Sequence, residues 1–143
     1  MLWKGGIKLG QYYIIANLDK KEYLDPHTFG DGAKLLEFGC GGVGMTTGLT
    51  ILLADGNNRG GGDLHSDNPI IGSWAGDRIV VTGDYADEGK FNEGNENLYG
   101  YARSHFENIS KEVIEAMKED SYIKEDLEGN SFYKLMSEKE DGI

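Results

Sequence analysis

The stretch NNRGGGD at 57–63 carries the residues best suited to bind an anion. Consecutive glycines can turn several backbone N–H groups toward one point and form an anion-binding nest. Arg59 could then hold a phosphate or carboxylate through two parallel hydrogen bonds. Three glycines in a row lose backbone entropy on folding, and loops are where binding residues concentrate. We therefore expect an anion site in this loop.

A second stretch, WAGDR at 74–78, extends this expectation. Arg78 would add another guanidinium, and Trp74 would offer an aromatic face to a base. Two arginines beside a nest can create a local positive potential even on an acidic protein. We predict a binding protein rather than an enzyme, with no cofactor and a small anionic ligand, such as a nucleotide. The predicted ligand-binding residues are Arg59, Gly60, Gly61, Gly62, Trp74 and Arg78.

Carboxylates and a histidine in the same region suggest an alternative. The motifs are D-x-H at 63–65, G-D-x-x-D at 83–87 and G-N-E at 94–96. They resemble the motifs of calcineurin-like phosphoesterases, in which two metal ions activate water. The resemblance implies a metal-dependent hydrolase that binds a divalent metal such as Mn²⁺ or Zn²⁺ through Asp63, His65, Asp84 and Asn95. The chain departs from that family before Asp63, where NNRGGG stands in place of an apolar strand.

The charge and cysteine content narrow the possible partners. A net charge of −11 repels phosphate backbones and argues against nucleic-acid binding. The same acidic surface leaves open a third class, an inhibitor that binds another protein. Cys40 is the only cysteine, so the chain has no internal disulfide. No apolar run approaches the roughly 20 residues that span a bilayer. We expect a cytoplasmic protein with no membrane partner.

The apolar pattern predicts an α+β domain with a mostly antiparallel sheet. Residues 11–24 combine aromatic and β-branched residues with a polar turn, which predicts an N-terminal hairpin. Segments 69–74 and 77–83 predict two further strands. Glycine makes up 22 of the 143 residues, against an average near 7%, which indicates many tight turns.

The same pattern predicts two or three helices. Segment 45–54 is apolar nearly all round, which suits a buried helix, although the period alone also allows a strand. Segment 110–120 is the best candidate, because it carries an apolar stripe formed by Ile109, Val113, Ala116 and Met117. We place a single domain at 10–137, with an N-terminal extension at 1–9 and a frayed tail at 138–143.

Four stretches resemble a small family of hypothetical proteins from bacteria and their phages: GQYYIIANLDKKEYLDPH, GDGAKLLEFG, ADGNNRGGGDL and GSWAGDRIVVTGDYAD. The resemblance implies a setting and no activity. By analogy with small phage proteins that bind nucleotide signals of host immunity, a phage-encoded chain would sequester such a signal in the host cytoplasm. We also expect a homo-oligomer, because a small domain forms a deeper pocket between subunits.

Overall fold

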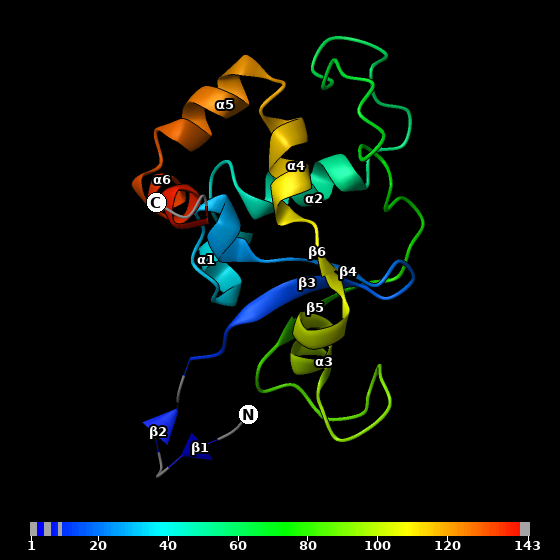
Figure 1. Cartoon of the computed structure of the whole chain (residues 1–143), viewed down its shortest axis with the longest axis vertical. Helices are drawn as coiled ribbons and strands as arrows, with labels where there is room; N and C mark the ends of the chain where they lie inside the picture. Colours follow the sequence, from blue (N-terminus) through cyan, green and yellow to red (C-terminus); the bar gives the residue numbers. More distant parts are fainter. Residues whose placement is uncertain (1–2, 5–6, 9, 141–143) are drawn as a thin grey trace.

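The computed structural model describes residues 3–4, 7–8 and 10–140 (Figure 1). Within the expected extension at 1–9, β1 (Trp3–Lys4) pairs antiparallel with β2 (Ile7–Lys8). The other residues of that extension lie outside the described part. Of the expected tail at 138–143, the first three residues belong to a helix and the last three lie outside the described part.

A four-stranded sheet forms the centre of the domain. The predicted N-terminal hairpin is confirmed, because the first two strands of this sheet pair antiparallel. The last strand lies parallel to its neighbour, so the sheet is mixed and the prediction of a mostly antiparallel sheet is wrong. That strand has only two residues, both polar and exposed, so it carries no alternating pattern. In spatial order the strands are β5 (Ile79–Gly83), β3 (Tyr13–Asn17), β4 (Glu22–Leu24) and β6 (Glu107–Asn108).

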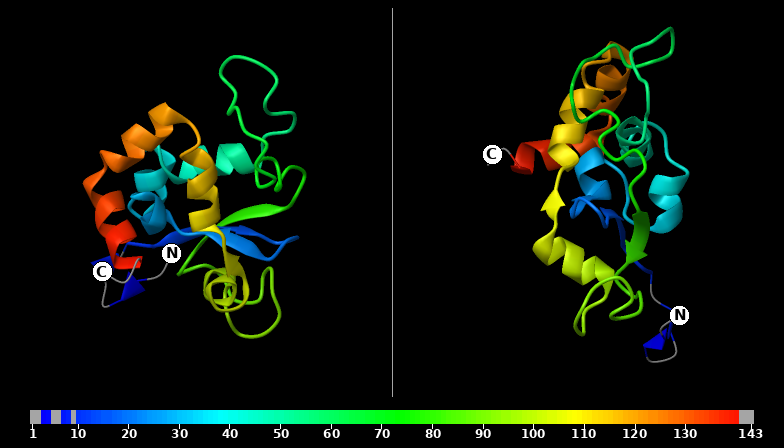
Figure 2. Two further views of the ribbon diagram at one scale, coloured as in Figure 1. Left: turned by 45° about the horizontal axis from the view of Figure 1, so that its top comes forward. Right: turned by 90° about the vertical axis from the view of Figure 1, so that its right-hand side faces the viewer.

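Strand β3 is buried on both faces, and this divides the core in two. Ile14 and Ala16 belong to the core cluster that includes Leu98 of α3 (Leu98–His105). Ile15, which points the other way, belongs to the larger core under the remaining helices. Figure 2 shows α3 on one side of the sheet and the other helices on the opposite side.

The described part of the chain contains six α-helices and one 3-10 helix, so the α+β class is correct but the prediction of two or three helices is wrong. The two helices nearest the C-terminus bury a single hydrophobic residue each, Leu127 and Tyr133. Such isolated contacts leave little periodic signal in the sequence. Besides α3, the helices are η1 (Pro26–Phe29), α1 (Leu35–Gly39), α2 (Met45–Leu52), α4 (Ser110–Met117), α5 (Ser121–Glu128) and α6 (Ser131–Glu140).

The two predicted helices are confirmed, whereas one predicted strand is not. All four residues of the stripe predicted at 110–120 are buried in or beside α4. The segment 69–74 forms successive turns, because its backbone bonds to the end of α2 rather than to a strand. In that contact the Trp74 N–H donates to the Leu52 carbonyl at 2.9 Å.

Gly48 sets the distance between α2 and its neighbours. A Cβ atom at this position would lie 2.9 Å from the Phe29 ring and 2.9 Å from Val113 Cγ1. Both neighbours are fully buried, so neither can move aside freely. The absence of a side chain therefore lets α2 pack closely against η1 and α4.

We predict that Gly48→Ala lowers the free energy of unfolding by about 1–2 kcal/mol, because overpacking outweighs the gain in helix propensity. Gly39→Ala is the matched control, since Gly39 also lies in a helix and a Cβ there would meet nothing within 4 Å. Urea unfolding of both variants measures the difference. Equal stability of the two variants would contradict the close packing.

Candidate functional site

The connection from α2 to β5 contains the glycine loop and lacks helices and strands. It projects from the body of the domain (Figure 1). Asn57 closes the loop through two hydrogen bonds with Leu64: its Nδ2 donates to the Leu64 carbonyl at 2.6 Å, and its Oδ1 accepts from the Leu64 N–H at 2.9 Å. These two hydrogen bonds give the glycine loop a defined conformation.

The loop already contains an anion of its own. The Arg59 N–H donates to Asp63 Oδ2 at 2.9 Å. The Arg59 side chain lines a hollow of about 480 Å³ whose wall also includes Asp55 and Asp67. Because Asp63 already accepts a loop N–H and two more carboxylates share the hollow with Arg59, the loop is less favourable to an incoming phosphate than the sequence alone suggests.

Trp74 lies inside the core and offers no face to a ligand. Its side chain is fully buried, and its indole Nε1 donates to Glu22 Oε1 at 2.8 Å. This bond ties the connection before β5 to strand β4. The aromatic part of any ligand site must therefore come from other residues.

Arg78 lines a different hollow, of about 520 Å³, whose lining includes no residue of the glycine loop. We call it the Arg78 hollow. Its cations come from the β3–β4 turn, the start of β5 and the segment before α3, and its aromatic rings come from that same segment and α3. The residues that define it are Lys21, Arg78, Lys90, Phe91, Tyr101 and Phe106.

The cations of the Arg78 hollow are only partly neutralised. Arg78 forms an ion pair with Asp19, with Nη2 and Oδ1 at 2.7 Å, which lowers the pKa of that carboxyl. One such pair leaves other guanidinium N–H groups free to donate. Lys21 and Lys90 form no ion pair with another residue in the described part of the chain. Glu93 also lines the hollow, but the cations outnumber it.

Two of the three aromatic residues of the hollow contact each other. The rings of Tyr101 and Phe106 meet edge to face with centroids 6.1 Å apart. On its other side, Tyr101 stacks on His105 at 4.3 Å. The Lys90 ammonium lies 5.5 Å from the centroid of the exposed Phe91 ring. The hollow thus combines positive charge with rings on which a planar group can pack.

A buried amide positions the cationic edge of the hollow. The Asn17 Oδ1 accepts from the N–H groups of Asp19 and Lys20, at 2.9 and 2.8 Å, and its Nδ2 donates to Asp77 Oδ2 at 2.9 Å. These bonds shape the turn that ends at Lys21, whose positive φ of 55° belongs to the left-handed region. The hydrogen bond from Asn17, followed by that from Lys20, lowers the pKa of Asp77.

The metal ligands of the alternative do not assemble. Asp63 and His65 lie in the glycine loop, whereas Asp84 follows the end of β5, where its Oδ1 accepts from the Tyr12 N–H at 3.0 Å. Asn95 is an exposed residue of the segment before α3. Among the described residues, no three His, Cys, Asp or Glu side chains are grouped closely enough to hold a metal ion.

Comparison with known proteins adds no assignment. No family model, curated protein or solved structure matches the chain. No helix in the described part is long and apolar enough to cross a membrane.

The Asn17–Asp77 bond predicts a loss of stability in acid. Because the pKa of Asp77 is below its ordinary value of 3.8 in the folded state, the unfolded chain takes up a proton first as the pH falls. The stabilisation is therefore present above about pH 4 and lost as the pH falls through the folded pKa. Asp77→Asn should flatten this acid loss when urea unfolding is measured from pH 6 to pH 2. Asp126→Asn, an exposed change on α5, should leave it intact, and identical profiles for both variants would refute the role of Asp77.

Proposed function

We propose that the protein binds a small anionic ligand with a planar aromatic part, such as a nucleotide, in the Arg78 hollow. The observation that supports the proposal is the convergence of three cationic side chains with three aromatic rings in one concavity. Its size falls within the range of small-molecule sites, about 300–1,000 Å³. The proposal keeps the ligand class expected from the sequence and keeps Arg78, but it replaces Arg59, Gly60, Gly61, Gly62 and Trp74.

Different side chains of the hollow would contact the anionic part and the planar part of the ligand. Lys21 and Lys90 are exposed ammonium groups that would contact phosphate oxygens together with the remaining donors of Arg78. Phe91 and Tyr101 would pack on the base or another planar ring. Neither contact alone favours a nucleotide over simpler ligands, but the combination favours an anion and a ring in the same molecule.

The biological setting follows from the sequence resemblance and remains part of the proposal. A chain of the phage-protein type would act by sequestering a nucleotide-derived signal without turning it over. Because Lys90 and Phe91 are exposed, a second copy of the chain could cover the ligand and deepen the site. Light scattering with and without ligand tests that homo-oligomer.

Titration calorimetry with a nucleotide panel tests the ligand class. The panel contains ADP, ADP-ribose and a cyclic dinucleotide, with adenosine and inorganic phosphate as the two half-ligands. We expect a nucleotide to bind more tightly than either half. Lys21→Gln and Lys90→Gln should each weaken binding about tenfold, the effect expected for loss of one charge-assisted hydrogen bond.

Lys124→Gln is the matched control, because Lys124 is an exposed lysine on α5, on the opposite side of the sheet from α3 (Figure 1). It changes the net charge equally and should leave affinity unchanged. Absence of heat from every nucleotide would refute the proposal. Equal weakening by all three substitutions would show a nonspecific charge effect instead of a site.

A further inference from the structure

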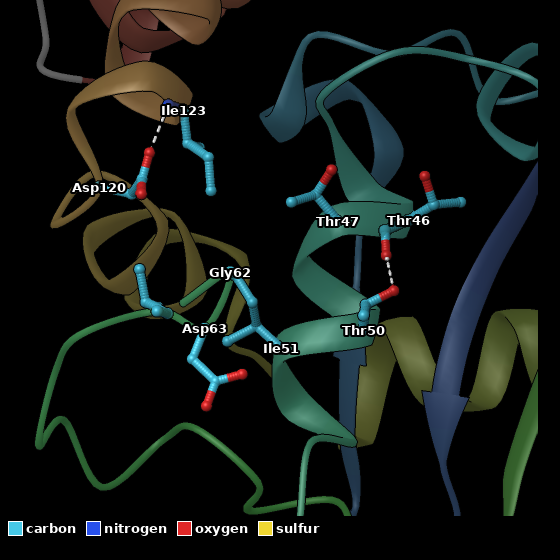
Figure 3. Close-up of a pocket in the computed structure, with 9 residues that line it drawn as sticks. Thr46, Thr47, Thr50, Ile51, Gly62, Asp63, Asp120 and Ile123 are labelled. Atoms are coloured by element: carbon cyan, nitrogen blue, oxygen red, sulfur yellow. Dashed lines mark hydrogen bonds between the residues drawn. The ribbon is translucent and has the colours of Figure 1, made fainter. Parts of the chain in front are cut away.

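A further cleft, of about 410 Å³, lies between α2, the glycine loop and the start of α5. Figure 3 shows Asp120 and Ile123 across from Thr47 of α2, and Asp63 of the glycine loop next to Ile51. We call it the Thr47 cleft. It shares no lining residue with the Arg78 hollow, so it requires a separate explanation.

The two carboxylates of the Thr47 cleft each retain an oxygen for a ligand. Asp120 Oδ1 accepts from the N–H groups of Tyr122 and Ile123, at 2.9 and 3.0 Å, and thereby caps α5. Asp63 accepts the Arg59 N–H through Oδ2. Neither the Oδ2 of Asp120 nor the Oδ1 of Asp63 has a hydrogen bond or ion pair within the described part of the chain. None of the described residues that line the cleft carries a positive charge.

The rest of the wall is apolar and hydroxylated. Ile51 and Leu64 are buried, and Ile123 is half-buried beside them. Thr47 Oγ1 accepts the Gly44 N–H at 3.3 Å, and the Thr50 hydroxyl donates to the Thr46 carbonyl at 2.8 Å. These hydroxyl oxygens retain acceptor capacity. The cleft therefore offers acceptors at its polar positions and methyl groups between them.

We propose that the Thr47 cleft binds a free aliphatic diamine or polyamine. An ammonium group has three donors and no acceptor, which matches carboxylate and hydroxyl oxygens. The methylene chain would lie against Ile51, Leu64 and Ile123 and lose its contact with water. An anion is disfavoured by both aspartates, whereas a diol would leave their charge uncompensated. The net charge of −11 further raises the local concentration of organic cations.

Calorimetry with a series of diamines tests this assignment. We expect affinity to rise from 1,2-diaminoethane to 1,5-diaminopentane by roughly fourfold per methylene, the value for full burial of a CH₂ group. 1,5-pentanediol, which has the same length without charge, should not bind. Asp63→Asn and Asp120→Asn should each weaken 1,5-diaminopentane about tenfold, because they remove the charge and retain an oxygen acceptor for the existing backbone bonds.

Asp126→Asn is the control for net charge, since Asp126 is exposed on the same helix as Ile123 and does not line the cleft. It should bind as the unchanged protein does. Equal affinity for all diamines, or equal effects of the three Asn substitutions, would overturn the proposal in favour of a diffuse acidic surface. Binding of the diol as tight as that of the diamine would also overturn it. Nα-acetyl-lysine amide separates a free amine from a protein lysine: we expect it to bind more weakly than 1,5-diaminopentane, and the reverse order would overturn the choice of a free ligand.

Discussion

The side-chain amide of Asn17 is the polar contact on which the arrangement of the Arg78 hollow depends. It is completely buried, and it joins the β3–β4 turn to the residue before Arg78. A buried amide without partners is costly, so each of its three hydrogen bonds constrains the groups around it. The turn places Asp19 against Arg78, and the Lys21 carbonyl accepts the N–H of Glu107 in β6 at 2.9 Å. One end of the sheet therefore fixes two cations of the hollow.

The double burial of β3 provides the corresponding constraint on the apolar side. A strand covered on both faces cannot shift its register by one residue without exchanging the two cores. Its pairing with β5 holds the start of that strand, and Arg78, beside the β3–β4 turn. Trp74 reinforces this placement, because its bond to Glu22 anchors the preceding connection to β4. The loops that line the two candidate sites thus start from a well-packed sheet. Such support favours binding sites that exist before the ligand arrives.

The sequence predicts the elements whose patterns are local and misses those that tertiary contacts create. The hairpin at 11–24 and the helix at 110–120 have the alternation or the stripe that identifies them. Strand β6 and helices α5 and α6 depend on a few contacts with distant residues. The candidate site follows the same division. Arg78 could be named from its motif, but Lys21 and Tyr101 are separated by 80 positions, and no spacing rule relates them. The prediction that Trp74 faces a ligand is wrong, because an aromatic residue among glycines fits a surface site and a core anchor equally well, and only the partner Glu22 distinguishes the two.

Net charge and local charge lead to different ligands on this molecule. The Debye length at physiological ionic strength is about 8 Å, so most of the acidic surface acts on a bound ligand only weakly. Within the Arg78 hollow the lining cations Lys21, Arg78 and Lys90 outnumber the lining carboxylate of Glu93. Charges at such short range are screened less than the distant acidic surface. In the Thr47 cleft the near charges, Asp63 and Asp120, and the distant ones have the same sign. An anion at the first site must therefore approach through a repulsive field before it meets attraction, whereas a cation is attracted to the second site at all distances. Added salt should consequently weaken binding of the cation through both the near and the distant charges. For the anion, added salt weakens the attraction of the close contacts and also reduces the long-range repulsion.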